Sequence, residues 1–90
     1  MGDLHMETYV PKIFEWNGYK FFFFSNEGNP LEPPHVHVRK GSAVAKMWLD
    51  PYVSLASSWG LTSKELSRIQ RVIEDRRDDI RSKWNEYFGS

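Results

Sequence analysis

The sequence predicts a small α+β domain, in which a long C-terminal helix packs on an antiparallel sheet of about four strands, with a short helix before the long one. Apolar segments joined by tight turns fill the first half of the chain and are typical of two β-hairpins. An apolar stripe with helical spacing runs through the C-terminal third. Because 90 residues leave room for one hydrophobic core, we expect a single domain over residues 6–90.

The first predicted hairpin covers residues 13–24. Its two strands, residues 13–16 and 19–24, are rich in β-branched and aromatic side chains. Asn17 and Gly18 between them form the pair that readily adopts positive φ at both central positions of a tight turn. Phenylalanine occurs on both faces of the second strand, so we expect this strand to lie inside the sheet. The four phenylalanines could also stack on nucleic-acid bases, but packing in the core is the favoured interpretation.

The second predicted hairpin covers residues 35–49 and turns at residues 40–42. Pro33 and Pro34 precede it and restrict the chain to an extended conformation as it enters the strand. Alternation along the strands gives each of them an apolar and a polar face. The polar face is expected to carry His35, His37, Arg39, Lys46 and Trp48. This segment has basic but no acidic side chains, although twelve basic residues balance twelve acidic ones in the whole chain.

The remaining residues predict helices. Residues 52–59 are interpreted as a brief helical segment that ends at Gly60. Thr62 and Glu65 then form a capping-box pattern, which marks the start of the long helix. The apolar stripe of that helix consists of Leu66, Ile69, Ile73, Ile80, Trp84 and Tyr87.

The polar surface of the long helix carries many basic residues that suggest nucleic-acid binding at first sight. Acidic residues lie at helical spacing from most of them, so ion pairs along the helix explain the pattern better. Glu74, for example, is expected to pair with Arg77. Only Lys64, Arg68 and Arg71 remain as a modest candidate site for an anion.

Composition limits the class of protein. The chain has no cysteine, which excludes disulfides and thiolate zinc sites and fits a reducing cytosol. Its longest apolar run, residues 21–24, is too short for a membrane span. We therefore expect a soluble cytoplasmic protein. Residues 1–5 precede a second methionine and are interpreted as a remnant of cloning or a disordered leader.

The two histidines on one strand face are the strongest candidate for chemistry. His35 and His37 could act as general acid and general base in RNA cleavage, with Arg39 and Lys46 holding the phosphate and Trp48 beside them. The 2′-hydroxyl of RNA would serve as the nucleophile, so such a ribonuclease would need no metal and no cofactor.

Two alternatives to this catalytic interpretation remain open. Neutral imidazoles of His35 and His37 could share a divalent metal such as zinc or nickel, but a complete site would need Asp50, Glu15 or Glu32 as a further ligand. Alternatively, the histidines only form hydrogen bonds to the preceding loop and fix its shape.

Residues 18–26, 29–30, 33–39, 45–51 and 84–88 together resemble a family of short bacterial and phage-associated proteins described as a domain of unknown function. The resemblance rests mainly on the central Pro-His-x-His-Val signature, which is Pro34 to Val38 here, and it extends over nearly the whole chain from about Val10. The loop before His35 is longer than in the shorter members.

The resemblance implies a cytoplasmic bacterial protein with a protein partner encoded by the adjacent gene, an arrangement similar to toxin-antitoxin pairs. Two functional hypotheses follow. The first is a member of such a pair that binds or cleaves RNA through the His-x-His-x-Arg strand face. The second is a non-catalytic protein-interaction module.

Overall fold

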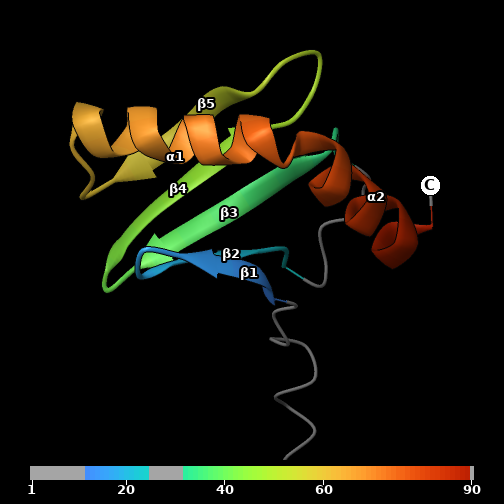
Figure 1. Cartoon of the computed structure of the whole chain (residues 1–90), viewed down its shortest axis with the longest axis horizontal. Helices are drawn as coiled ribbons and strands as arrows, with labels where there is room; N and C mark the ends of the chain where they lie inside the picture. Colours follow the sequence, from blue (N-terminus) through green and yellow to red (C-terminus); the bar gives the residue numbers. More distant parts are fainter. Residues whose placement is uncertain (1–11, 25–31, 90) are drawn as a thin grey trace, which may run out of the picture.

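The computed structural model describes residues 12–24 and 32–89. These residues form one antiparallel sheet with the strand order β1-β2-β3-β4-β5 (Figure 1). The strands are β1 Lys12–Trp16, β2 Tyr19–Phe22, β3 His35–Lys40, β4 Ala43–Trp48 and β5 Ser54–Trp59. The predictions for residues 1–5 and for most of the loop before Pro33 fall outside the described residues. The α+β class is confirmed, with one strand more than expected.

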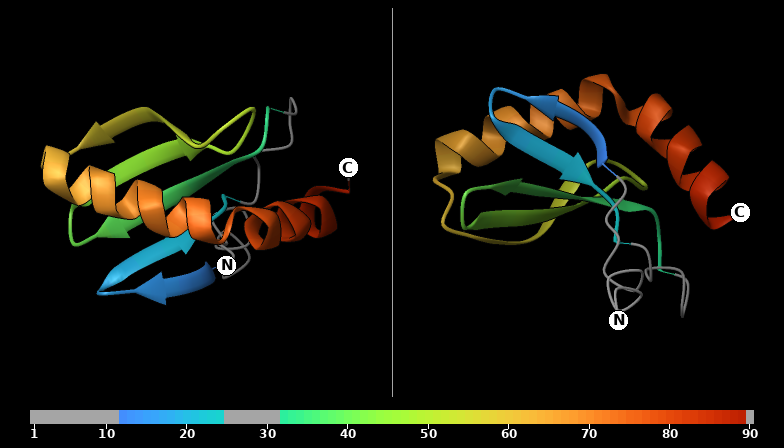
Figure 2. Two further views of the ribbon diagram at one scale, coloured as in Figure 1. Left: turned by 45° about the horizontal axis from the view of Figure 1, so that its top comes forward. Right: turned by 90° about the horizontal axis from the view of Figure 1, so that it is seen from below.

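Two helices follow the sheet, α1 over Ser63–Asp75 and α2 over Arg77–Phe88. Both belong to one side of the molecule: α1 runs along one face of the sheet, and α2 turns away past the end of the strands (Figure 2). The opposite face of the sheet has no helix over it in these views. We call this opposite face the outer face. In the described part of the chain, no helix is long and apolar enough to cross a membrane.

Both predicted hairpins are confirmed. Asn17 and Gly18 have φ of 54° and 84°, the left-handed conformation that the tight turn requires. β2 lies between β1 and β3, as expected for a strand with phenylalanine on both faces. In the second hairpin Lys40 pairs with Ala43, so the turn consists of Gly41 and Ser42.

The core lies between the sheet and the helices. Strand alternation sends Val36 and Val38 of β3 into it, where both are fully buried. The largest contributions from the other elements come from Phe21, Phe23, Met47, Leu49, Ile69, Ile73, Ile80 and Trp84. Tyr87, the last member of the predicted stripe, is exposed instead.

The predicted short helix at residues 52–59 is wrong, because residues 54–59 form the edge strand β5. Ser54 pairs with Trp48 and Trp59 pairs with Val44, so the backbone groups of this segment hydrogen-bond to β4 rather than to one another. Its small, serine-rich sequence has neither a strong strand pattern nor a strong helix pattern, and pairing with β4 decides its conformation. Gly60 does end the segment. A Cβ atom there would lie 3.2 Å from the Cβ of Ala43.

The capping box at the start of α1 is confirmed. The Thr62 hydroxyl accepts a hydrogen bond from the Glu65 backbone N–H (3.1 Å), and the Thr62 N–H donates to Glu65 Oε1 (2.9 Å). The second carboxylate oxygen of Glu65 accepts a hydrogen bond from the Tyr19 hydroxyl at 2.7 Å. The backbone hydrogen bond from Thr62, followed by the one from Tyr19, lowers the pKa of Glu65. The same contact with Glu65 raises the pKa of Tyr19 and joins α1 to β2.

The predicted single long helix is broken at Arg76, whose φ of −116° lies outside the helical range. No glycine or proline marks this position. The break instead accompanies contacts between Arg77 and the sheet. After the break, Arg77 points to the sheet instead of pairing with Glu74. Its Nε donates to the Leu49 carbonyl oxygen at 2.6 Å and its guanidinium donates to Asp50 at 2.8 Å.

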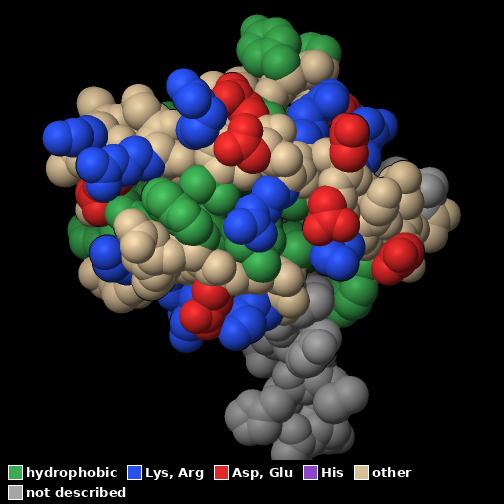
Figure 3. All heavy atoms as spheres, in the orientation of Figure 1, with side chains coloured by type: hydrophobic (Ala, Val, Ile, Leu, Met, Phe, Trp, Pro, Cys, Tyr) green, Lys and Arg blue, Asp and Glu red, His purple; other side chains and the backbone are tan. Residues whose placement is uncertain are grey.

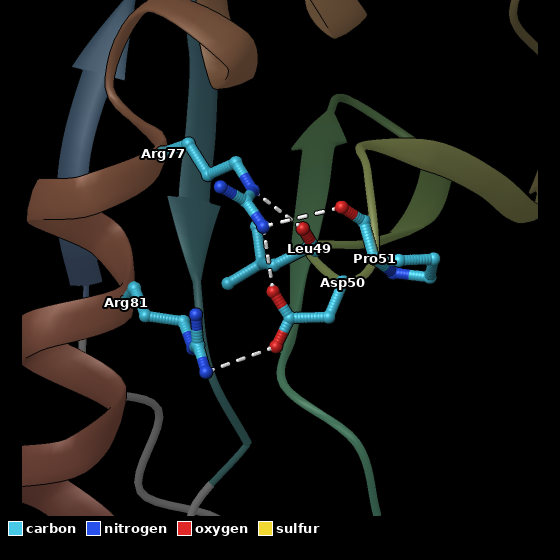
Figure 4. A network of polar contacts seen from close by, with 5 residues as sticks. All are labelled: Leu49, Asp50, Pro51, Arg77 and Arg81. Carbon is cyan, nitrogen blue, oxygen red and sulfur yellow. Dashed lines mark hydrogen bonds and ion pairs between the residues drawn. The ribbon is translucent and has the colours of Figure 1, made fainter.

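Asp50 receives two arginines from α2. Arg77 binds one carboxylate oxygen, and Arg81 approaches the other at 3.2 Å (Figure 4). The Asp50 side chain is 26% exposed, so water screens these ion pairs only in part. Because Asp50 lies two residues after the end of β4, the cluster fixes the start of α2 against the end of the sheet.

The pH dependence of stability tests the contacts of Glu65. A carboxylate with a lowered pKa stabilises the fold above its ordinary value of 4.5, and this contribution disappears as pH falls through the lowered pKa. We therefore expect the stability difference between wild type and Glu65→Gln to be large at about pH 7 and to shrink towards about pH 3 in urea unfolding. Tyr19→Phe removes one of the hydrogen bonds that lower the pKa of Glu65, so it should make the stability of the fold depend less on pH. A difference that is independent of pH would contradict this account.

The Asp50 cluster gives a second prediction. Asp50→Asn removes the charge that both arginines share, and we expect it to lower the free energy of unfolding by about 1–2 kcal/mol. The control is Glu86→Gln, which removes an exposed charge from α2, the helix that carries both arginines. It should change the free energy of unfolding by less than about 0.5 kcal/mol. Chemical denaturation measures both variants, and equal losses would show that the cluster does not anchor α2.

Candidate functional site

The outer face of the sheet contains a shallow groove of about 310 Å³. Strands β2 to β5 all contribute to it. Its lining includes Phe22, Phe24, His37, Arg39, Val44, Lys46, Ser57 and Trp59. Aromatic and basic side chains thus gather on the face that the helices leave open. We call this depression the outer groove.

The strand register brings the predicted site residues together. His35 is paired with Trp48, and His37 is paired with Lys46. Arg39 continues the row on β3 and faces Val44. All five predicted residues therefore belong to one face of a single hairpin, although they differ in how far a ligand could reach them.

His35 is fully buried, with 0% of its surface exposed. Its ring lies between the rings of Trp48 (5.5 Å between centroids) and Trp84 (5.0 Å), the latter from α2. Its Nδ1 atom lies 2.9 Å from the Pro33 carbonyl oxygen. Because a carbonyl only accepts hydrogen bonds, Nδ1 carries the hydrogen in this contact. His35 thus fixes the Pro33-Pro34 entry to β3, and a substrate could not touch it without a rearrangement.

His37 lies at the floor of the outer groove and is half-buried. Its ring stacks on Phe22 with centroids 5.6 Å apart and planes 22° apart. Phe24 meets it edge-on at 4.5 Å, and His35 lies 5.1 Å away. Three rings therefore hold the imidazole in place, and one side remains open to the groove.

Lys46 is the basic residue across from His37. Its ammonium group donates to Glu32 Oε1 at 2.9 Å and lies 4.6 Å from the centre of the Trp48 ring. The same Glu32 oxygen is 3.9 Å from Nδ1 of His35. Glu32 thus links the buried histidine to the surface lysine.

A second depression of about 200 Å³ adjoins the outer groove and shares Phe22 and Arg39 with it. Lys12 and Lys20 complete its lining. Lys12 is paired with Glu15 at 2.8 Å, which lowers the pKa of Glu15. The positive surface therefore extends from β4 across β3 to β1.

Sequence reasoning missed the aromatic part of this site. Phe24 was expected in the core with its neighbours, but it is 36% exposed and lines the outer groove. Phe22 is buried as expected, at 5% exposure, although its ring also belongs to the groove lining. Alternation along β2 carries the signal, because Phe21 and Phe23 fill the core and leave the other two on the opposite face. Trp59 was missed because β5 was expected to be helical.

The metal alternative finds no support among residues 12–24 and 32–89. No three His, Cys, Asp or Glu residues of these segments lie together in a way that could hold a metal ion. Asp50 is bound by two arginines, and Glu15 is paired with Lys12 on β1. Glu32 lies close to His35, but this makes only a single further ligand.

The helical side of the molecule has a different character. Figure 3 shows Lys and Arg side chains intermixed with Asp and Glu side chains over this side. Arg68 and Arg71, from the candidate anion site, line an open depression that also contains Asp75. An acidic group thus accompanies these arginines. In the outer groove Lys46 is likewise paired with Glu32, but no acidic side chain of the described residues is in the groove lining itself.

Comparisons with known proteins agree with the extent of the fold. A family model described as a domain of unknown function, DUF4160, matches residues 18–85. This range includes β2 to β5, α1 and most of α2, and with them the outer groove. No curated protein and no solved structure matches the chain. The chain belongs to the DUF4160 family of domains of unknown function.

Proposed function

We propose that this domain binds single-stranded RNA through the outer groove, as one member of a toxin-antitoxin-like pair. One observation carries the RNA-binding part: exposed aromatic rings and basic side chains share the part of a sheet face that no helix covers. Phe24 and Trp59 are 36% and 65% exposed at the groove. Arg39 and Lys46 lie between them on β3 and β4.

The two kinds of side chain suit the two parts of a nucleotide. Bases stack on aromatic rings, which contributes about 1–3 kcal/mol per base. Phosphates bind to basic side chains, and the released counterions make such binding sensitive to salt. Arg39 lies beside both kinds of contact: its guanidinium can bind a phosphate, and it lies 5.7 Å from the centre of the Phe22 ring.

The shape of the groove favours a single strand. A shallow depression across a sheet allows bases to lie flat on exposed rings, but bases inside a duplex are stacked on one another and cannot do so. The four neighbouring strands that line the groove offer a path from Lys20 and Phe22 towards Trp59. A neutral chain can bind RNA in this way, because Lys20, Arg39 and Lys46 line adjoining depressions on one face and no acidic side chain of the described residues is in that lining.

Binding is better supported than cleavage by a pair of histidines. General acid–base catalysis requires both groups within hydrogen-bonding distance of the substrate. His37 lines the groove, where a bound substrate could contact it, whereas His35 is enclosed between two tryptophans. We assign His35 the role of a positioning residue, which holds His37 and the loop entry in place.

A protein-interaction module is the second candidate function. Exposed apolar side chains on β5, including Leu55 and Trp59, favour it. The partner would be the product of the adjacent gene, as the resemblance to toxin-antitoxin pairs implies. This function needs no chemistry from either histidine and is compatible with RNA binding on the outer face.

The salt dependence of RNA binding tests the proposed function. We expect Arg39→Gln to weaken binding of a labelled single-stranded RNA by about tenfold and to reduce the slope of log affinity against log salt by about one. Arg71→Gln makes the same chemical change on the helical side and should leave both quantities unchanged. Fluorescence anisotropy at several salt concentrations measures them.

Two results would reject this function. One is that wild-type protein binds no RNA at low salt, and the other is that Arg39→Gln and Arg71→Gln weaken binding equally. The bound RNA should also keep its full length during the experiment. Cleavage that is lost in His37→Ala would instead restore the two-histidine mechanism.

A further inference from the structure

The smaller depression beside the outer groove is lined mainly by basic side chains. Among the described residues, its lining consists of Lys12, Lys20, Arg39 and Phe22. The strand register explains this cluster, because Lys12 is the partner of Phe22 across β1 and β2, and Lys20 is the partner of Arg39 across β2 and β3. Directly opposed residues of an antiparallel pair share one face of the sheet. Three neighbouring strands thus each contribute one positive charge to this depression, which we call the basic depression.

Acidic groups compensate only part of this positive charge. Lys12 is paired with Glu15 at 2.8 Å. Its hydrogen bond and charge lower the pKa of Glu15, and Lys20 on the neighbouring strand adds a smaller effect. Glu15 itself does not line the depression. Within segments 12–24 and 32–89, Lys20 and Arg39 form no ion pair with an acidic residue. Two of the three positive charges therefore remain for a ligand.

The basic depression offers no surface on which a base can stack. Among the described residues of its lining, Phe22 carries the only ring, and this residue is 5% exposed. Phe24 and Trp59 in the adjoining outer groove are exposed instead. A base stacks only on a ring face that it can reach. The basic depression therefore suits a phosphate without a base, next to a surface that suits bases.

We propose that the basic depression binds the terminal phosphate of the single-stranded RNA that lies in the outer groove, an inference that rests on the proposed function. A phosphodiester inside the RNA carries one negative charge and continues into a further nucleoside. A terminal phosphate monoester carries about 1.5 to 2 negative charges at about pH 7, which matches the two uncompensated side chains. The depression also lies towards β1, the edge of the sheet, where the bound RNA can end.

The two uncompensated side chains have different positions in this arrangement. Arg39 lines both the basic depression and the outer groove, so its guanidinium can contact the RNA on either side of the boundary. Lys20 lines the basic depression alone. A change at Lys20 therefore separates recognition of the terminal phosphate from binding in the outer groove.

Three RNAs of one sequence, each labelled at an internal position, test the inference by fluorescence anisotropy at low salt. One has a 5′-phosphate, one has a 3′-phosphate, and one has hydroxyl groups at both ends. We expect one of the phosphorylated RNAs to bind about fivefold more tightly than the hydroxyl-ended RNA, and Lys20→Gln to reduce this ratio to about one. The RNA that shows the preference identifies which end is bound. Binding of the hydroxyl-ended RNA by Lys20→Gln shows that the variant is folded.

Two control variants make the same chemical change elsewhere. Lys46→Gln acts on the β4 side of the outer groove and should weaken binding of all three RNAs while keeping the ratio. Lys83→Gln removes an exposed charge from α2 and should change neither quantity.

The possible failures of the inference and of the proposed function can be told apart. The inference alone is overturned if wild type binds all three RNAs equally, because RNA binding itself would then stand. A ratio that survives Lys20→Gln, or that falls as much in Lys46→Gln, overturns it in the same way. If wild type binds none of the three RNAs, the proposed function and the inference are both overturned.

Discussion

The alternation of side chains along β3 is the constraint on which both the core and the candidate site depend. Val36 and Val38 point into the core and are fully buried. The residues between and beside them therefore face the opposite side, because a strand cannot send neighbours to the same face. With β2 on one side and β4 on the other, β3 cannot slip by one residue without burying Arg39 and exposing both valines.

The two ends of β3 then acquire different roles. At its start, His35 is covered by Trp84 of α2 and bonds to the Pro33 carbonyl. Further along, His37 and Arg39 lie beyond the reach of the helix and remain accessible. The position of α2 therefore decides which polar residues of β3 are accessible: His35 is buried beneath the helix, and His37 and Arg39 line the outer groove. The Asp50 cluster maintains that position, since Arg77 ties the start of α2 to the end of β4.

Sequence reasoning worked where the signal was local. Asn17 with Gly18, and Thr62 with Glu65, specify a turn and a helix start through contacts between near neighbours, so both were predictable. The β5 strand depends on pairing with β4, and its own serine-rich sequence has no clear preference. The break at Arg76 likewise has no glycine or proline to announce it.

The same distinction applies to the candidate site. The pairing of His37 with Lys46 follows from hairpin alternation and was expected. The burial of His35 was not, because the tryptophan that covers it comes from the far end of the chain. Phe24 and Trp59 joined the site only once the order of the strands was known. These missed residues change its character, from a pair of catalytic histidines to an aromatic and basic surface suited to binding.

An NMR titration with a short single-stranded RNA tests the central claim most directly, because it reports every backbone amide at once. If the outer groove binds RNA, the shifted signals will cluster at residues 22–24, 37–39, 44–46 and 57–59, and the exposed face of α1 will be unaffected. Shifts concentrated on α1, or no shifts at low salt, would contradict the account.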